Sequence, residues 1–99
     1  MSKSIIQEKK ECYLCRALYD SERIHALEEH HCIPGTAHRR LCTKYGLTVW
    51  LCADHHRTGK NAAHRNIETM AFLKLTAQKA FEKKYSHEEF MNVFGKNYI

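Results

Sequence analysis

Proline and long apolar segments are both scarce in this chain. One proline occurs among 99 residues, and no segment is rich in glycine, serine or proline, so the sequence offers no linker at which it could be divided. The apolar runs are only a few residues long, whereas a membrane-spanning helix needs about 20 apolar residues. We therefore expect a single domain over residues 1–99 and no association with a membrane.

Export is also disfavoured, because the N-terminal segment contains no apolar core of the kind that secretory signals carry. The expected location is the cytoplasm, where cysteines serve more often as metal ligands or free thiols than in disulfides. The chain has five cysteines and eight histidines. In so short a domain, a metal ion would supply stability that a small hydrophobic core lacks.

Two pairs of side chains have the spacing typical of zinc sites. The pairs are Cys12 with Cys15 and Cys52 with His55. A separation of two intervening residues lets both side chains of a pair reach one tetrahedral ion. The sequence therefore predicts one structural zinc ion that joins the N-terminal region to the middle of the chain. The other cysteines are interpreted as buried free thiols.

Turn residues and β-forming segments predict a small α+β fold. Strands are expected over residues 27–33 and 47–51, with a loop between them, because Pro34-Gly35 and Gly46 bound segments that favour strands. Residues 1–26 are interpreted as a zinc knuckle followed by a loop.

Helices are expected to follow the strands. They cover residues 53–58, residues 66–85 and the segment from Ser86 to Gly95. The long helix carries an apolar stripe at helical spacing, which predicts a buried face. The stripe consists of Ile67, Met70, Leu73, Ala77, Ala80 and Phe81. Residues 67–99 should therefore brace the metal-rich residues 12–66.

Histidines form a second pattern around the zinc pairs. It consists of one doublet before the expected loop, another after it and one further residue: His30, His31, His55, His56 and His64. Neighbouring side chains on a strand point to opposite faces, so the first doublet can share a site only if the chain bends just after it. On a helix, adjacent side chains diverge by about 100°. One member of the second doublet can therefore serve the zinc while the other faces a second site.

In these motifs the chain resembles the HNH endonucleases, or ββα-metal nucleases, and especially their small zinc-containing members from phages and prophages. The resemblance covers residues 12–66. Its most specific parts are His30-His31-x-x-Pro34 and Leu51-Cys52-x-x-His55-His56. It implies a phage or prophage protein that hydrolyses DNA in the bacterial host cytoplasm, with His31 as the general base. The implied ligands of a catalytic divalent metal ion are His30, His56 and His64.

Two positions depart from the family pattern. The asparagine that orients the base in these nucleases would fall near Gly46 or Leu47, so a backbone carbonyl is expected to take over its role. The last metal ligand would fall at Lys60. His64 is therefore expected to reach the site from further along the chain, with Asn61 as the alternative.

The chemistry of these residues suits phosphodiester hydrolysis. An imidazole with an ordinary pKa of about 6.5 is mostly neutral near pH 7, so His31 can accept a proton from water. Three neutral nitrogen ligands suit Mn²⁺, Ni²⁺ or Zn²⁺ better than Mg²⁺, although all four ions stay candidates for the catalytic metal.

The charge of the chain favours a polyanionic partner. Sixteen basic residues against 11 acidic ones give a net charge of +5, as expected for DNA binding. The residues expected to contact the DNA backbone are Arg39, Arg40, Arg57, Lys60 and Arg65. Such contacts position DNA without reading its bases. A homodimer or an assembly with phage packaging proteins stays open.

Two other functions are compatible with the same residues. A zinc-dependent DNA-binding module without catalysis is favoured by the missing asparagine, and it predicts DNA binding without cleavage. In a purely structural or protein-interaction zinc domain, the doublet of His30 and His31 would be incidental. A plasmid-nicking assay distinguishes the nuclease from both.

Overall fold

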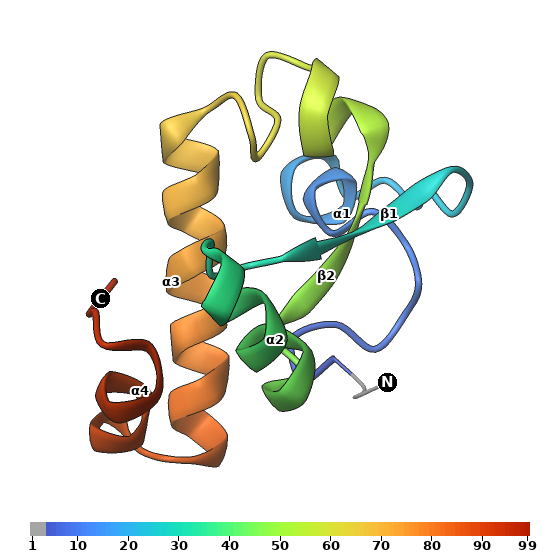
Figure 1. The fold of residues 1–99 in the computed structure, drawn as a ribbon. Helices are drawn as coiled ribbons and strands as arrows, with labels where there is room; N and C mark the ends of the chain where they lie inside the picture. The colour runs from blue at the N-terminus through green and yellow to red at the C-terminus, as the bar shows by residue number, and fades with distance from the viewer. Residues whose placement is uncertain (1–3) are drawn as a thin grey trace.

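The computed structural model describes residues 4–99 and shows a small α+β fold (Figure 1). In chain order its elements are α1 (Tyr13–Tyr19), β1 (Leu27–His31), α2 (Thr36–Tyr45), β2 (Thr48–Cys52), η1 (Asp54–Thr58), α3 (Ile67–Lys84) and α4 (His87–Phe94). The short element η1 is a π-helix. The expected α+β class is confirmed. Within the described residues, no helix combines the length and the apolar character that crossing a membrane would need.

The two expected strands pair antiparallel in a two-stranded sheet. Leu27 of β1 pairs with Cys52 of β2, and His31 pairs with Thr48. β1 ends at His31 rather than at Ile33. The pairing therefore brings the last residue of β2, a predicted zinc ligand, to the beginning of β1, and η1 follows directly.

The connection between the strands contains helix α2 and is not the expected loop. Gly35 (φ 112°) precedes this helix and Gly46 (φ 73°) ends it, and glycine adopts such positive φ values with little strain. The apolar face of α2 consists of the buried Cys42 with Leu41 and Tyr45 packed against the core, and this spacing is a helical signal that the loop prediction did not use. Another short helix, α1, replaces part of the loop expected within residues 1–26.

Both C-terminal helices begin where their capping residues predict. The side chain of Asn66 accepts hydrogen bonds from backbone N–H groups in the first turn of α3, and Ser86 accepts one from the first turn of α4 at 3.1 Å. Gly95 (φ 72°) ends α4. The expected buried stripe is confirmed at Leu73, Ala77 and Phe81. Met70 and Ala80 are half-buried, and Ile67 was predicted wrongly, because it is 86% exposed. Helix α3 first enters the core at Leu73.

One cluster of buried apolar side chains extends through the fold from Cys12 to Phe94. The ring centroid of Phe81 in α3 lies 5.4 Å from that of Phe90 in α4 and 5.2 Å from that of Tyr45 in α2. In Figure 1, α3 runs beside the sheet, and α4 lies next to the C-terminal end of α3. The C-terminal helices therefore pack behind the part of the chain that carries the cysteine and histidine pairs.

Candidate metal centres

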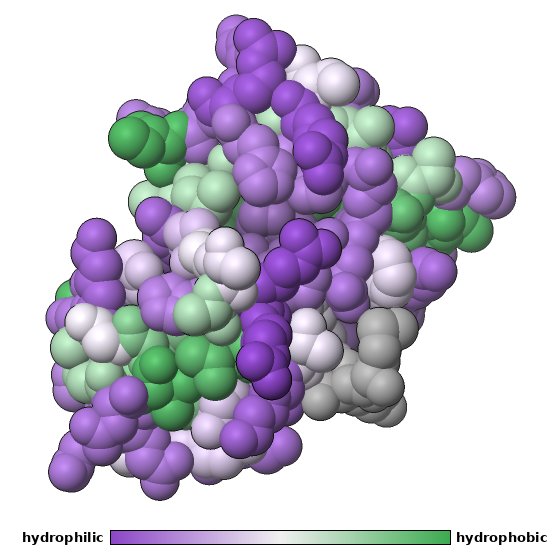
Figure 2. Space-filling view, viewed as in Figure 1, coloured by the Kyte–Doolittle hydropathy of each residue, from purple (hydrophilic) through white to green (hydrophobic). Residues whose placement is uncertain are grey.

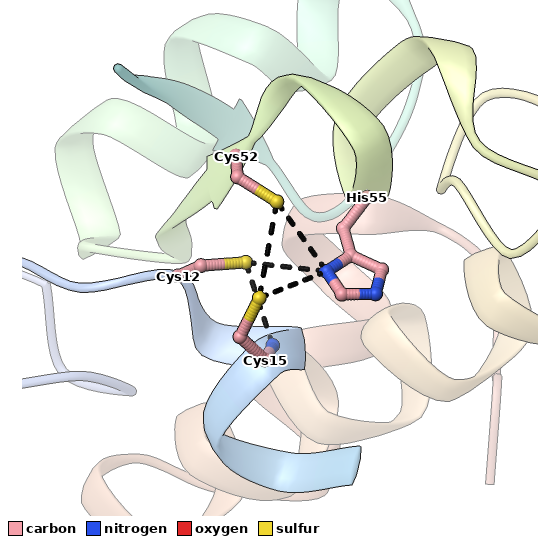
Figure 3. A group of neighbouring side chains, drawn as sticks. All are labelled: Cys12, Cys15, Cys52 and His55. Atoms are coloured by element: carbon pink, nitrogen blue, oxygen red, sulfur yellow. Dashed lines mark hydrogen bonds between the residues drawn. The ribbon is translucent and has the colours of Figure 1, made fainter. Parts of the chain in front are cut away.

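Three cysteines and His55 meet in a buried cluster, which we call the cysteine cluster (Figure 3). The Nδ1 atom of this histidine lies 3.5 Å from Cys12 Sγ, 3.4 Å from Cys15 Sγ and 3.5 Å from Cys52 Sγ. The Sγ atoms of Cys15 and Cys52 lie 3.9 Å apart. Around a tetrahedral zinc ion, two sulfur atoms lie about 3.8 Å apart and a nitrogen lies about 3.5 Å from each sulfur. The spacing of the four side chains therefore fits one tetrahedral metal ion such as zinc.

The ligands of the cysteine cluster come from three regions of the fold. Cys12 is the N-cap of α1, and its Sγ accepts a hydrogen bond from the Cys15 N–H at 3.4 Å. Cys52 ends β2 and His55 lies in η1. Burial and the neighbouring Cys12 thiol raise the pKa of Cys15 to about 12. Binding of a metal ion must therefore displace the proton of the Cys15 thiol, and it would join α1 to the end of the sheet.

A second group, which we call the histidine group, contains His30, His56 and His64, whose ring nitrogens lie within 4.8 Å of one another. The Nε2 atoms of His56 and His64 lie 3.2 Å apart. Within the described part of the chain, Nε2 of His30 is the one buried side-chain nitrogen or oxygen that has no hydrogen-bond partner. An unpaired buried nitrogen beside two others fits a bound cation. Imidazole donors favour a transition metal over Mg²⁺.

Burial keeps two of these rings neutral. Burial and the neighbouring histidines, His56 and His64 first among them, lower the pKa of His30 to about 3. Burial also lowers the pKa of His64. A neutral imidazole carries a lone pair, so both rings can bind a metal ion near pH 7 without first losing a proton.

The chain after η1 folds back and brings His64 to the histidine group. The His64 N–H donates to the His56 carbonyl at 3.2 Å, and the Ala63 N–H donates to the His55 carbonyl at 2.7 Å. These bonds place the predicted ligand beside η1 despite the sequence separation. The alternative ligand, Asn61, instead accepts a hydrogen bond from a neighbouring asparagine at 3.4 Å.

The π-helix η1 divides two adjacent histidines between the two groups. His55 directs its Nδ1 to the sulfur atoms, whereas His56 directs its Nε2 to the histidine group. Gly59 closes this turn, because its N–H donates to the Asp54 carbonyl at 2.8 Å. A Cβ atom at Gly59 would overlap that carbonyl oxygen, so the close approach requires glycine.

Glu28 supports the histidine group and is not part of any sequence motif. Its Oε1 accepts a hydrogen bond from His56 Nδ1 at 2.7 Å, and this bond lowers the pKa of Glu28. A neutral imidazole has one N–H, so Nε2 of His56 stays free to bind a metal ion. The signal that predicts Glu28 is strand alternation, because Glu28 and His30 are two positions apart on β1 and share a face.

His31 lies beside the histidine group, in a cleft of about 440 Å³ that the three group members also line. Its side chain is 16% exposed. The Nε2 atom lies 3.1 Å from Thr43 Oγ1 and 3.7 Å from Glu29 Oε1. Burial lowers the pKa of His31, although the Glu29 carboxylate opposes this effect. Both members of the first doublet therefore line one cleft.

The carbonyl expected to orient His31 is replaced by a hydroxyl. The Gly46 carbonyl accepts a hydrogen bond from the N-terminal segment at 2.9 Å, and the Leu47 carbonyl accepts one from the Cys32 N–H at 3.1 Å. Both carbonyls are thus engaged elsewhere, and the contact to His31 comes from Thr43 of α2. Thr43 was not predicted because it lies on α2, in the segment that was expected to be a loop.

The basic residues expected to contact DNA have different surroundings. Arg39 and Arg57 line the cleft. Arg40 lies beside Arg39 in a shallow hollow on α2, and Lys60 is exposed. Arg65 donates from its guanidinium to the last carbonyl of η1 at 2.6 Å. The face that carries α2 and η1 is largely hydrophilic, with apolar patches near α4 and at the edges of the view (Figure 2).

The two groups differ in what they can do chemically. The four side chains of the cysteine cluster would complete the tetrahedral coordination shell of a metal ion, which is typical of a structural site. The histidine group has three nitrogen donors in an open cleft, so a metal ion there would keep positions for other ligands. No family model, no curated protein and no solved structure matches this chain.

Proposed function

We propose that this protein is a metal-dependent HNH-type endonuclease that hydrolyses DNA phosphodiester bonds. The observation that carries the proposal is the convergence of three histidine nitrogens at one cleft with His31, where the buried Nε2 of His30 has no other partner. In this proposal β1, β2 and η1 form a ββα-metal core. Zn²⁺ is the structural ion of the cysteine cluster.

The residues of the cleft have different roles in the proposed reaction. His30, His56 and His64 would hold the divalent metal ion, which supplies stabilisation of charge on the scissile phosphate and on the leaving oxygen. His31 accepts a proton from the attacking water through its neutral imidazole. The two arginines that line the cleft bind the DNA phosphates and hold the backbone over the histidines.

Nicking of supercoiled plasmid tests the proposal. We expect the zinc-loaded native protein to convert the plasmid to open-circular or linear DNA with Mn²⁺. Cleavage should stop when EDTA removes the added ion. Parallel reactions with Ni²⁺, Zn²⁺ and Mg²⁺ identify the preferred metal. Binding of the plasmid without cleavage with all four ions would contradict the nuclease and support the non-catalytic DNA-binding module.

Replacing His55 and replacing His56 should affect different properties of the protein. We expect His56→Ala to lower Mn²⁺ affinity and abolish nicking with little change in melting temperature, because His56 belongs to the histidine group. His55→Ala should instead lower the melting temperature, since it removes one of four structural ligands. Calorimetric titration with Mn²⁺ and thermal melting measure both effects. The reverse result would exchange the roles of His55 and His56.

Replacing Glu28 should weaken the metal site without removing a ligand. We expect Glu28→Gln to reduce Mn²⁺ affinity roughly 10- to 100-fold, because partners that orient metal ligands commonly contribute this much. The matched control is Glu82→Gln, since Glu82 accepts an equally short hydrogen bond of 2.7 Å from His87 Nδ1, outside both metal groups. Equal Mn²⁺ affinities in the two variants would show that Glu28 does not support the site.

A further inference from the structure

We infer that Thr43 is a positioning residue for His31: its hydroxyl holds the imidazole with the proton on Nε2 and leaves Nδ1 as the proton acceptor. The inference rests on the proposed function, because it assigns an orienting partner to the proposed general base. The inference concerns the neutral imidazole of His31, and it identifies which of the two ring nitrogens accepts the proton.

The hydrogen bonds around Thr43 determine the direction of its contact with His31. Oγ1 of Thr43 lies 3.2 Å from the Arg39 carbonyl and 3.1 Å from His31 Nε2. A hydroxyl has one proton, and a carbonyl can only accept. Both contacts can be hydrogen bonds together only if Thr43 donates its proton to the Arg39 carbonyl and its oxygen accepts from His31. Nε2 of His31 must then carry the ring proton.

The Glu29 carboxylate also favours a proton on Nε2 of His31. Its Oε1 lies 3.7 Å from Nε2 of His31, so its negative charge favours a proton on this nitrogen over a lone pair. A neutral imidazole has a single N–H, which leaves the lone pair on Nδ1. Among the described residues Nδ1 has no hydrogen-bond partner, and it is not one of their buried unpaired atoms. Water can therefore reach Nδ1.

The position of Thr43 is set by the packing of α2 against the end of β1. The adjacent residue, Cys42, is fully buried, and its Sγ lies 3.4 Å from the Ile33 nitrogen and 3.6 Å from the Ile33 oxygen. These contacts tie α2 to the chain just after His31. The Thr43 hydroxyl is additionally held by its bond to the carbonyl four residues earlier. The orienting group is thus fixed before any substrate binds.

Variants of Thr43 test this role through nicking kinetics with Mn²⁺. We expect Thr43→Val, which keeps the shape but removes the hydroxyl, to lower kcat roughly 10- to 100-fold with little change in KM, as for other orienting partners. Thr43→Ser restores the hydroxyl and should recover most of the activity. The matched control is Thr76→Val, because Thr76 makes the same bond to the carbonyl four residues earlier, at 2.8 Å, in α3. Its activity should equal that of the native protein.

The tautomer of His31 gives a readout that does not depend on activity. In a long-range ¹H–¹⁵N correlation spectrum of the zinc-loaded native protein, assigned with His31→Ala, we expect a protonated Nε2 and an unprotonated Nδ1. A proton on Nδ1 would overturn the inference. A Thr43→Val protein that nicks DNA as fast as the native protein would also overturn the inference. A native protein that fails to nick with every metal would instead overturn the proposed function, and the catalytic role of Thr43 would fall with it.

Discussion

The Cys12→Ser protein is expected to lose its structural metal ion and to be unfolded under conditions in which the native protein is stable. Cys12 is one of the four side chains of the buried cysteine cluster and also the N-cap of α1. In small zinc domains the free energy of metal binding is about 10–16 kcal/mol and contributes directly to folding. Whole domains are stable by only about 5–15 kcal/mol. Loss of the ion therefore exceeds what the rest of this small core can offset.

The matched control for this variant is Cys42→Ser. Cys42 is as buried as Cys12, with 0% exposure for both, but it lies outside the metal groups. Its sulfur makes hydrogen bonds to the backbone of Ile33, and a hydroxyl can make similar bonds. We expect Cys42→Ser to keep its metal content and most of its thermal stability. Elemental analysis and thermal melting compare the two variants. A zinc-free Cys12→Ser protein with an unchanged melting temperature would refute the structural site.

The His31→Ala protein is expected to lose most of its nicking activity while it keeps its fold, zinc content and DNA affinity. His31 belongs to neither metal group, so its removal deletes only the proposed proton acceptor. Proton transfer by a positioned side chain contributes roughly 10²–10⁴-fold to rate. An exposed histidine outside the cleft, His25, gives the control variant His25→Ala. Near-native nicking by His31→Ala would make His30 the candidate base.

The pH dependence of nicking should report on the same residue. Burial lowers the pKa of His31, and Arg39 acts in the same direction against the opposing Glu29 carboxylate. The ring therefore stays neutral, and able to accept a proton, below the ordinary histidine pKa of about 6.5. A metal cation on the adjacent His30 would lower the pKa further. We expect nicking rates between pH 5 and 9 to decline only at the acidic end. A decline that begins above pH 7 would contradict this assignment.

Short-range patterns in the sequence were sufficient for the ligands and for the C-terminal helices. A spacing of two intervening residues puts both side chains of each pair, Cys12 with Cys15 and Cys52 with His55, on one turn, and the packing of α1 against the end of the sheet brings the two pairs together. The caps of α3 and α4 are equally local, since an N-cap side chain bonds to the next few backbone N–H groups. The sequence alone also indicates His64, although only as a ligand that must return from beyond η1.

Tertiary structure alone decided which side chains form hydrogen bonds with the histidines of the cleft. Glu28 and His56 are 28 positions apart, and Thr43 and His31 are 12 positions apart. The first contact depends on η1 lying against β1, and the second depends on α2 occupying the connection that the sequence leaves as a loop. Local sequence patterns do not specify such packing, because each contact joins residues that are far apart in the chain. The sequence by itself therefore indicated the residues of the two candidate metal groups, whereas the orientation of the histidines follows only from how the strands and helices pack.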